Sequence, residues 1–101
     1  MFRVVKRNGK TVDFNISKIS DAIKKAFDAQ EKEYNQSIID LLALRVTADF
    51  EPKIKNGLID VEDIQDSVES VLVQAGYADV AKAYILYRRQ REKMRKMKST
   101  I

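Results

Sequence analysis

The apolar positions of this chain follow a helical repeat over most of its length. Residues spaced three and four apart build apolar faces in four segments, a spacing typical of amphipathic helices packed on a core. The second face is the widest and predicts a central core helix, with the apolar residues Ile38, Ile39, Leu41, Leu42, Leu44, Val46 and Phe50. The four predicted helices are Ser17–Ala29, Asn35 or Ser37 to about Glu51, Asp60 to Ala75, and about Asp79–Lys98.

Two short extended segments precede the first helix. Met1–Lys6 and Thr11–Phe14 flank Asn8-Gly9, the dipeptide most typical of a tight β-hairpin. An isolated hairpin is marginally stable in water, so this one must pack on the helices. A second Asn-Gly, at Asn56-Gly57, precedes Leu58-Ile59, which could add a third strand. We therefore predict an α+β fold that is mostly α, a four-helix bundle capped by a small two- or three-stranded β-sheet.

Residues suited to cap helices stand at the predicted helix ends. Asn15 or Ser17 can cap the first helix, because a side-chain oxygen there accepts hydrogen bonds from unpaired N–H groups. Ser37 and Asp40 have the spacing of a capping box at the start of the second helix. Gly76 follows the third helix, where glycine readily adopts the left-handed conformation that ends a helix.

The composition excludes several classes of chemistry. The chain has 101 residues, which suits one small domain, and contains neither cysteine nor histidine. Disulfides, thiolate or zinc chemistry and a histidine base are therefore absent, and the three separated glycines form no phosphate-binding loop. We predict that this chain has no catalytic residues. No segment resembles a signal peptide or a membrane span, so we expect a cytoplasmic protein without a membrane partner.

Positive charge is concentrated near the end of the chain. The net charge is +4, but residues 88–98 contain seven basic residues and one acidic residue, so the other 90 residues carry a net charge of −2. A solvated helical face explains such a segment, and a contact with phosphate or nucleic acid is the alternative.

A second group of cations surrounds the start of the first helix. Lys18 falls in the first turn, where the helix dipole is positive and a cation is unfavourable. Lys6 and Arg7 come from the adjoining hairpin. Three cations around a helix N-terminus suggest a bound phosphate, because the free N–H groups there bind phosphate well. The alternative is a solvated basic turn whose cations point apart.

Tyr87 and Arg91 are one turn apart on the face that carries Val80 and Tyr84. Such a tyrosine can simply pack in the core. Alternatively, it can stack on a base while the arginine reaches a phosphate.

The segment VVKRNGKTVDFNISKISDAI resembles the signature of the ATP-cone family, and the similarity extends through the helix YILYRRQREKM to nearly the whole chain. The resemblance implies a regulatory nucleotide-binding module, four helices capped by a small sheet, as found at the N-terminus of ribonucleotide reductases. In that family ATP permits activity and dATP stops it. The ending YRRQREKMRKMKSTI resembles the passage from the cone into the catalytic body of anaerobic ribonucleoside-triphosphate reductases.

The resemblance also implies a set of nucleotide-binding residues. It gives Val4 a place near the base, Lys6 and Lys18 places on the phosphates, and Asn15 a place near the ribose or phosphates. Val12 stands where many members carry glutamate, which leaves the preference between ATP and dATP open. The implied nucleotide-binding residues are Val4, Lys6, Arg7, Asn15, Lys18, Ile19, Gln65, Tyr87 and Arg91.

Partners and ligands follow from the same resemblance. We expect ATP or dATP as an allosteric ligand, with Mg²⁺ arriving on the phosphates and no zinc. We expect residues 1–98 to form the cone and 99–101 to begin a linker to a catalytic domain of the reductase that this chain lacks. Cones can also pair with each other. A basic helical nucleic-acid-binding module or a ligand-free interaction module is the alternative function, although we do not expect nucleic acid as a partner.

Overall fold

The computed structural model describes the backbone of residues 2–99 and the side chains of residues 2–94. The side chains of Arg95, Lys96 and Lys98 lie outside the described part of the chain, as do the residues Thr100 and Ile101 of the expected linker.

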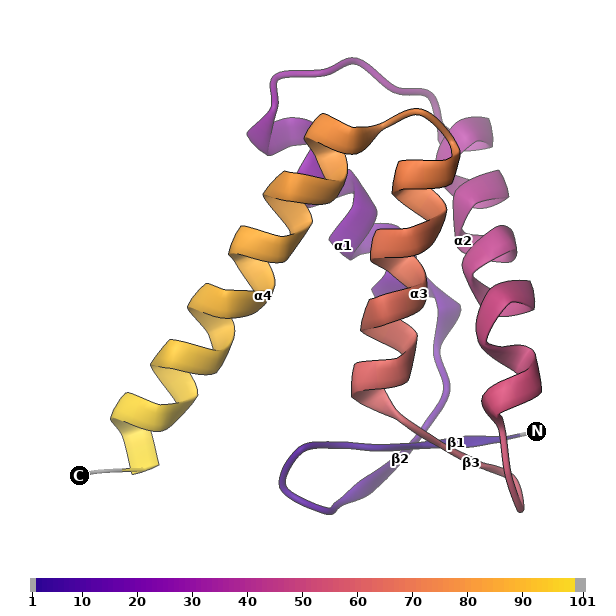
Figure 1. Ribbon diagram of the computed structural model, residues 1–101, viewed down its shortest axis with the longest axis vertical. Helices are drawn as coiled ribbons and strands as arrows, with labels where there is room; N and C mark the ends of the chain where they lie inside the picture. The colour runs from indigo at the N-terminus through magenta and orange to yellow at the C-terminus, as the bar shows by residue number, and fades with distance from the viewer. Residues whose placement is uncertain (1, 100–101) are drawn as a thin grey trace.

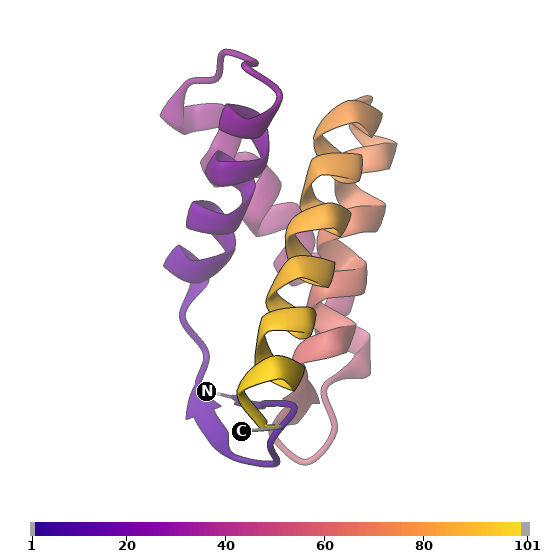
Figure 2. The same ribbon diagram turned by 90° about the vertical axis from the view of Figure 1, so that its left-hand side faces the viewer.

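Four helices within the described residues form a bundle with the strands at one end (Figure 1). Each helix packs against two others, in the cyclic order α1, α2, α3, α4. The last helix runs back toward the end that carries the strands, as Figures 1 and 2 both show. The predicted α+β, mostly α architecture is confirmed. The helices are α1 (Ile16–Ala29), α2 (Gln36–Phe50), α3 (Val61–Gln74) and α4 (Ala78–Ser99), with a short 3-10 turn at Glu51–Lys53.

The sheet has three strands in the described part of the chain, in the order β2-β1-β3. β1 (Arg3–Val5) pairs antiparallel with β2 (Thr11–Asp13), so the predicted hairpin is confirmed. β3 (Leu58–Asp60) lies parallel to β1 on its other side, which confirms the optional third strand. Strand β3 leads directly into α3, and this connection places the start of α3 beside the hairpin.

Helix ends follow the predicted chemistry with one exception. Asn15 Oδ1 accepts hydrogen bonds from the Ser17 N–H at 3.0 Å and the Ser17 hydroxyl at 2.7 Å, so Asn15 caps α1. The predicted capping box of Ser37 and Asp40 is wrong, because Asn35 Oδ1 caps α2 at the Ile38 N–H and Asp40 accepts from Gln36 instead.

The end of α3 is a Schellman motif. Gly76 has φ +90°, and hydrogen bonds run from its N–H to Val73 and from the Tyr77 N–H to Leu72. The prediction that Gly76 ends this helix is therefore confirmed.

The core is continuous between the helices and the sheet, but one expectation about it was wrong. Of the apolar residues on α2, Ile39, Leu42 and Val46 are buried, whereas Leu41 and Leu44 are 58% and 60% exposed. Helix α2 therefore covers the bundle from one side and does not lie at its centre. Its outer apolar residues face solvent because only α1 and α3 pack closely against it.

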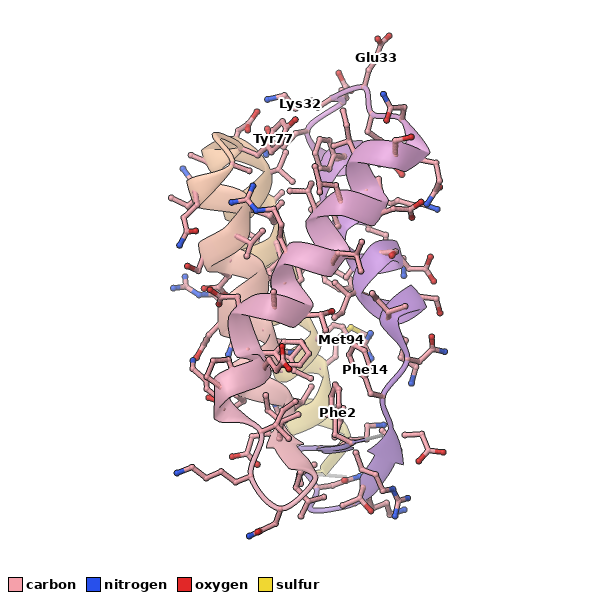
Figure 3. The ribbon with its side chains drawn as sticks, turned by 90° about the vertical axis from the view of Figure 1, so that its right-hand side faces the viewer. Phe2, Phe14, Lys32, Glu33, Tyr77 and Met94 are labelled. Carbon is pink, nitrogen blue, oxygen red and sulfur yellow. The ribbon has the colours of Figure 1, made fainter. Side chains whose placement is uncertain are left out.

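Three phenylalanines fasten the hairpin to α2. Phe2 and Phe14 stack with ring centroids 4.6 Å apart, and both meet the edge of Phe50, each at 5.7 Å. Figure 3 shows Phe2 and Phe14 together at the strand end of the molecule. This cluster holds β1 and the end of β2 against the bundle. Val4 and Val12 lie on the same face of the hairpin as Phe2 and Phe14, and this face packs on the core formed by the helices.

Candidate functional site

A cavity of about 470 Å³ opens between the hairpin and the helices α1, α3 and α4. Figure 2 shows these three helices rising from the strand end, where the hairpin closes the bundle. All nine residues that the sequence analysis assigned to a nucleotide line this cavity: Val4, Lys6, Arg7, Asn15, Lys18, Ile19, Gln65, Tyr87 and Arg91. The fold thus brings together residues that are up to 87 positions apart in the chain. Their contact with a nucleotide stays a prediction.

The floor of the cavity is apolar and buried. Val4, Ile19 and Ile64 belong to the core and also line the cavity, and Val68 and Tyr84 continue this surface along α3 and α4. A ligand placed here would cover apolar side chains with one part and reach the polar rim with another. Such an apolar cavity with a few polar groups is typical of small-molecule sites.

The rim carries an excess of positive charge. The acidic residue Asp13 is already paired with Arg3 outside the cavity, at 3.3 Å. Six basic and three acidic residues line the cavity, namely Lys6, Arg7, Lys18, Lys25, Arg88 and Arg91, and Asp13, Asp21 and Glu92. The cavity is therefore suited to an anion.

The N-terminus of α1 opens at this rim. Its first turn contains no acidic side chain, so the partial positive charge of the helix end is not offset locally. Lys18 lies in this turn, is exposed, and has no carboxylate within 4.0 Å among the described residues. Lys6, across the cavity on the hairpin, is likewise without an ion-pair partner in the described part of the chain.

Arg7 differs from these two lysines because it is already paired. Its guanidinium lies 3.6 Å from Glu62 on α3 and 3.2 Å from Glu92 on α4, and it donates a hydrogen bond of 3.2 Å to Gln65 Oε1. Its side chain is only 18% exposed. Arg7 is therefore not a third uncompensated cation, contrary to the expectation from the sequence. Of these three cations, Lys6 and Lys18 are the two without an ion-pair partner among the described residues.

Tyr87 and Arg91 contact each other as their spacing predicts. Arg91 donates a hydrogen bond of 3.1 Å to the Tyr87 hydroxyl, and its guanidinium carbon lies 5.8 Å from the ring centroid. Lys25 Nζ lies 5.7 Å from the same ring. The hydrogen bond from Arg91 is the main cause that lowers the pKa of Tyr87. Tyr87 therefore holds two cations at the α1–α4 side of the cavity.

Two further cations line the cavity, Arg88 and Lys25, and neither was predicted from the sequence as a site residue. Arg88 bridges α4 to α3, with contacts of 2.9 Å to Asp66 and 2.8 Å to Glu69. Burial disfavours its charge, but the hydrogen bonds to both carboxylates outweigh this and raise the pKa of Arg88. Lys25 follows Lys18 by seven residues, or two turns of α1, and this spacing was the available signal.

Two features are absent from the described part of the chain. Among the described residues, no group of three or more acidic side chains is arranged to hold a metal ion. No helix within residues 2–99 combines the length and apolar character needed to cross a membrane.

The fold and the cavity define a small helical domain, closed by a β-sheet at one end, with an apolar pocket and a basic rim. A family model described as the ATP cone domain matches residues 2–93. The chain therefore belongs to the ATP-cone family, which confirms the resemblance in its sequence.

Several reductases contain a similar segment. The ribonucleoside-diphosphate reductase subunit alpha of Chlamydia pneumoniae is 41% identical over 98 residues, which cover 91% of this chain and 9% of that protein. The vitamin B12-dependent ribonucleoside-diphosphate reductase of Mycobacterium tuberculosis (strain CDC 1551 / Oshkosh) is 35% identical, covering 98% of this chain and 14% of that protein. The anaerobic ribonucleoside-triphosphate reductase of Haemophilus influenzae is 34% identical, with shares of 99% and 14%.

This chain thus spans about a tenth to a seventh of the length of these relatives. An anaerobic reductase is among them, as the end of the chain suggested, but so are two kinds of diphosphate reductase. The similarity does not single out one branch of reductases.

Proposed function

We propose that this chain binds ATP or dATP in the cavity and thereby regulates the overall activity of a ribonucleotide reductase. The observation that carries the proposal is that Lys6 and Lys18 line one cavity beside the N-terminus of α1, without carboxylate partners among the described residues. A cavity of about 470 Å³ lies within the range of about 300–1,000 Å³ common for small-molecule sites.

The roles of the residues follow from their chemistry. Lys6, Lys18 and Arg91 bind the phosphates, assisted by the N–H groups at the start of α1. Val4 and Ile19 offer the base an apolar surface. The nucleotide brings a polyanion and, with it, Mg²⁺, for which the described residues supply no cluster of three carboxylates.

Regulation requires that nucleotide binding alter a neighbouring domain. We propose a catalytic domain of the reductase as that partner, because the relatives are about seven to ten times longer than this chain. The chain itself supplies the regulatory site and not the catalytic one.

ATP and dATP differ in the 2′-hydroxyl, and one hydrogen bond contributes about 0.5–1.5 kcal/mol. Symmetric pairing of two cones would double this difference. Size-exclusion chromatography with each nucleotide tests this amplification, and identical elution profiles would exclude pairing that differs between ATP and dATP.

Calorimetric titration of the 101-residue chain with Mg²⁺–ATP and Mg²⁺–dATP tests binding itself. We expect saturable binding that weakens at least tenfold in Lys18→Ala, since a charge-assisted hydrogen bond is lost. Lys24→Ala is the matched control, because Lys24 lies on the same helix but does not line the cavity. No heat and no thermal shift at millimolar nucleotide would overturn the proposal. Strongly salt-dependent binding of DNA or RNA would then favour the basic-helix alternative.

A further inference from the structure

Tyr84 lines the cavity but has no role in the nucleotide site described so far. It lies on α4, only 6% exposed, and lines the cavity next to Val68 and Ile64 on α3. Its helical spacing in the sequence identified it only as part of the apolar face of α4. Phenylalanine or leucine would fill such a core position equally well, so the hydroxyl requires its own explanation.

The hydroxyl of Tyr84 has no hydrogen-bond partner among the described residues. Arg88 lies one turn further along the same helix, and its guanidinium donates to Asp66 and Glu69. In the described part of the chain, Ser67 Oγ is the side-chain oxygen that is both shielded from solvent and without a hydrogen-bond partner. The Tyr84 hydroxyl is not shielded from solvent in this way, and Tyr84 is one of the residues that line the cavity.

The hydroxyl is a hydrogen-bond donor over the whole physiological range. Burial raises the pKa of Tyr84 to about 12, although the nearby Arg88 opposes this shift. The phenol therefore stays neutral and keeps its proton, and a neutral phenol suits an oxygen acceptor. Buried polar groups in proteins nearly always have a hydrogen-bond partner. We therefore expect the unpartnered Tyr84 hydroxyl to find an acceptor on a ligand bound in the cavity.

We propose that the Tyr84 hydroxyl donates a hydrogen bond to an oxygen atom of the bound nucleotide, which makes Tyr84 a further nucleotide-binding residue of this site. The inference rests on the proposed nucleotide-binding function of the cavity. Seven residues separate Tyr84 from Arg91, which corresponds to about 10 Å along α4. Tyr84 therefore contacts a part of the ligand away from the hairpin, where neither Lys6 nor Arg7 is placed.

The test is Tyr84→Phe, which removes only the hydroxyl and keeps the ring in the core. Calorimetric titration of the 101-residue chain with Mg²⁺–ATP should show about three- to tenfold weaker binding. The melting temperature without nucleotide should change by less than about 2 °C, because no hydrogen bond within the protein is lost. A purely structural hydroxyl would give the reverse pattern, a lower melting temperature with unchanged affinity.

Tyr77→Phe is the matched control. Tyr77 packs on Phe27 with ring centroids 5.1 Å apart and lies near Lys32, at the end of the bundle away from the strands (Figure 3). It loses the same hydroxyl without touching the cavity, so its affinity for ATP should equal that of the wild-type chain.

A titration with Mg²⁺–dATP locates the acceptor. A loss seen with ATP alone assigns it to the 2′-hydroxyl, and an equal loss with both nucleotides assigns it to an oxygen that they share. Both results support the proposal. Equal affinity of Tyr84→Phe and the wild-type chain for both nucleotides overturns it while leaving nucleotide binding intact. If the wild-type chain binds neither nucleotide, the proposed function fails, and the role of Tyr84 fails with it.

Discussion

Arg7 and Glu92 form an ion pair of 3.2 Å that joins the hairpin turn to α4 across the cavity. Glu62 shares the same guanidinium at 3.6 Å. A phosphate that engages Arg7 must therefore compete with two carboxylates. The pair also connects the turn between β1 and β2 with the helix that leads toward the end of the chain.

Glu92→Gln should strengthen nucleotide binding about two- to fivefold, because it removes one competitor for Arg7. The same change should lower the free energy of unfolding by no more than about 0.5 kcal/mol, since the Glu92 side chain is 44% exposed. Calorimetry and urea denaturation measure the two effects. Glu33→Gln, on the exposed connection between α1 and α2, is the control, and equal affinities of the two variants would contradict this competition.

Arg88 should contribute measurably to the stability of the fold. It joins α4 to Asp66 and Glu69 on α3, and its side chain is only 18% exposed. Arg88→Met should therefore lower the free energy of unfolding by about 1–2 kcal/mol, measured by urea denaturation.

Adding Glu69→Gln should recover part of this loss, because it removes one of two carboxylates left without a partner. Arg89→Met is the control, since Arg89 is exposed and outside the cavity. If the double variant is as unstable as the sum of the single ones, Arg88 and Glu69 do not interact significantly.

The fold was predictable where the information is local. Asn8-Gly9 specifies the first turn, and Asn15 and Gly76 end helices through contacts within a few residues. The parallel pairing of β3 with β1 was not determined locally, since it joins segments more than 50 residues apart. The exposure of Leu41 and Leu44 could not be predicted either, because periodicity identifies the apolar residues of a helix but not the neighbouring elements that cover them.

In the candidate site, too, local features were predictable from the sequence and distant contacts were not. Lys18 stood out because a cation in the first turn of a helix is unfavourable without an anion. The partners of Arg7 could not be foreseen, because Glu62 and Glu92 lie on two different helices distant in sequence. Tyr84 looked like a core residue in the sequence, and only the three-dimensional structure shows that it lines the cavity.

Tyr84 also gives the chain a distinctive dependence on alkaline pH. The pKa of Tyr84 is about 12 in the folded chain, chiefly through burial, against 10.0 as the ordinary value. The folded state thus favours the protonated phenol. The contribution of Tyr84 to the free energy of unfolding is therefore fully present below pH 10 and is lost as the pH rises toward 12.

Between pH 9 and pH 11 the wild-type chain should lose about 1 kcal/mol more stability than Tyr84→Phe. Urea denaturation of both proteins at each pH measures this difference. Parallel stability profiles would show that the tyrosine ionises in the folded chain as readily as in the unfolded one.

The end of α1 contains a conformation that the sequence does not favour. Glu31 has φ +52° and follows the C-cap residue Gln30, with the Lys32 N–H hydrogen-bonded to Phe27 in a Schellman arrangement. A side chain in the left-handed region is strained, and a negative charge at a helix C-terminus is unfavourable. Glu31→Gly should therefore raise the free energy of unfolding by about 0.5–1 kcal/mol, net of the greater chain entropy of glycine.

A urea denaturation midpoint measures the effect of Glu31→Gly. Asn56→Gly is the control, because Asn56 has nearly the same φ of +55°, but asparagine tolerates the left-handed region. Its gain should be smaller than that of Glu31→Gly. A lower midpoint for Glu31→Gly would mean that Glu31 is not strained in the folded chain. Neither residue lines the cavity, so nucleotide affinity should remain at the wild-type value in both variants.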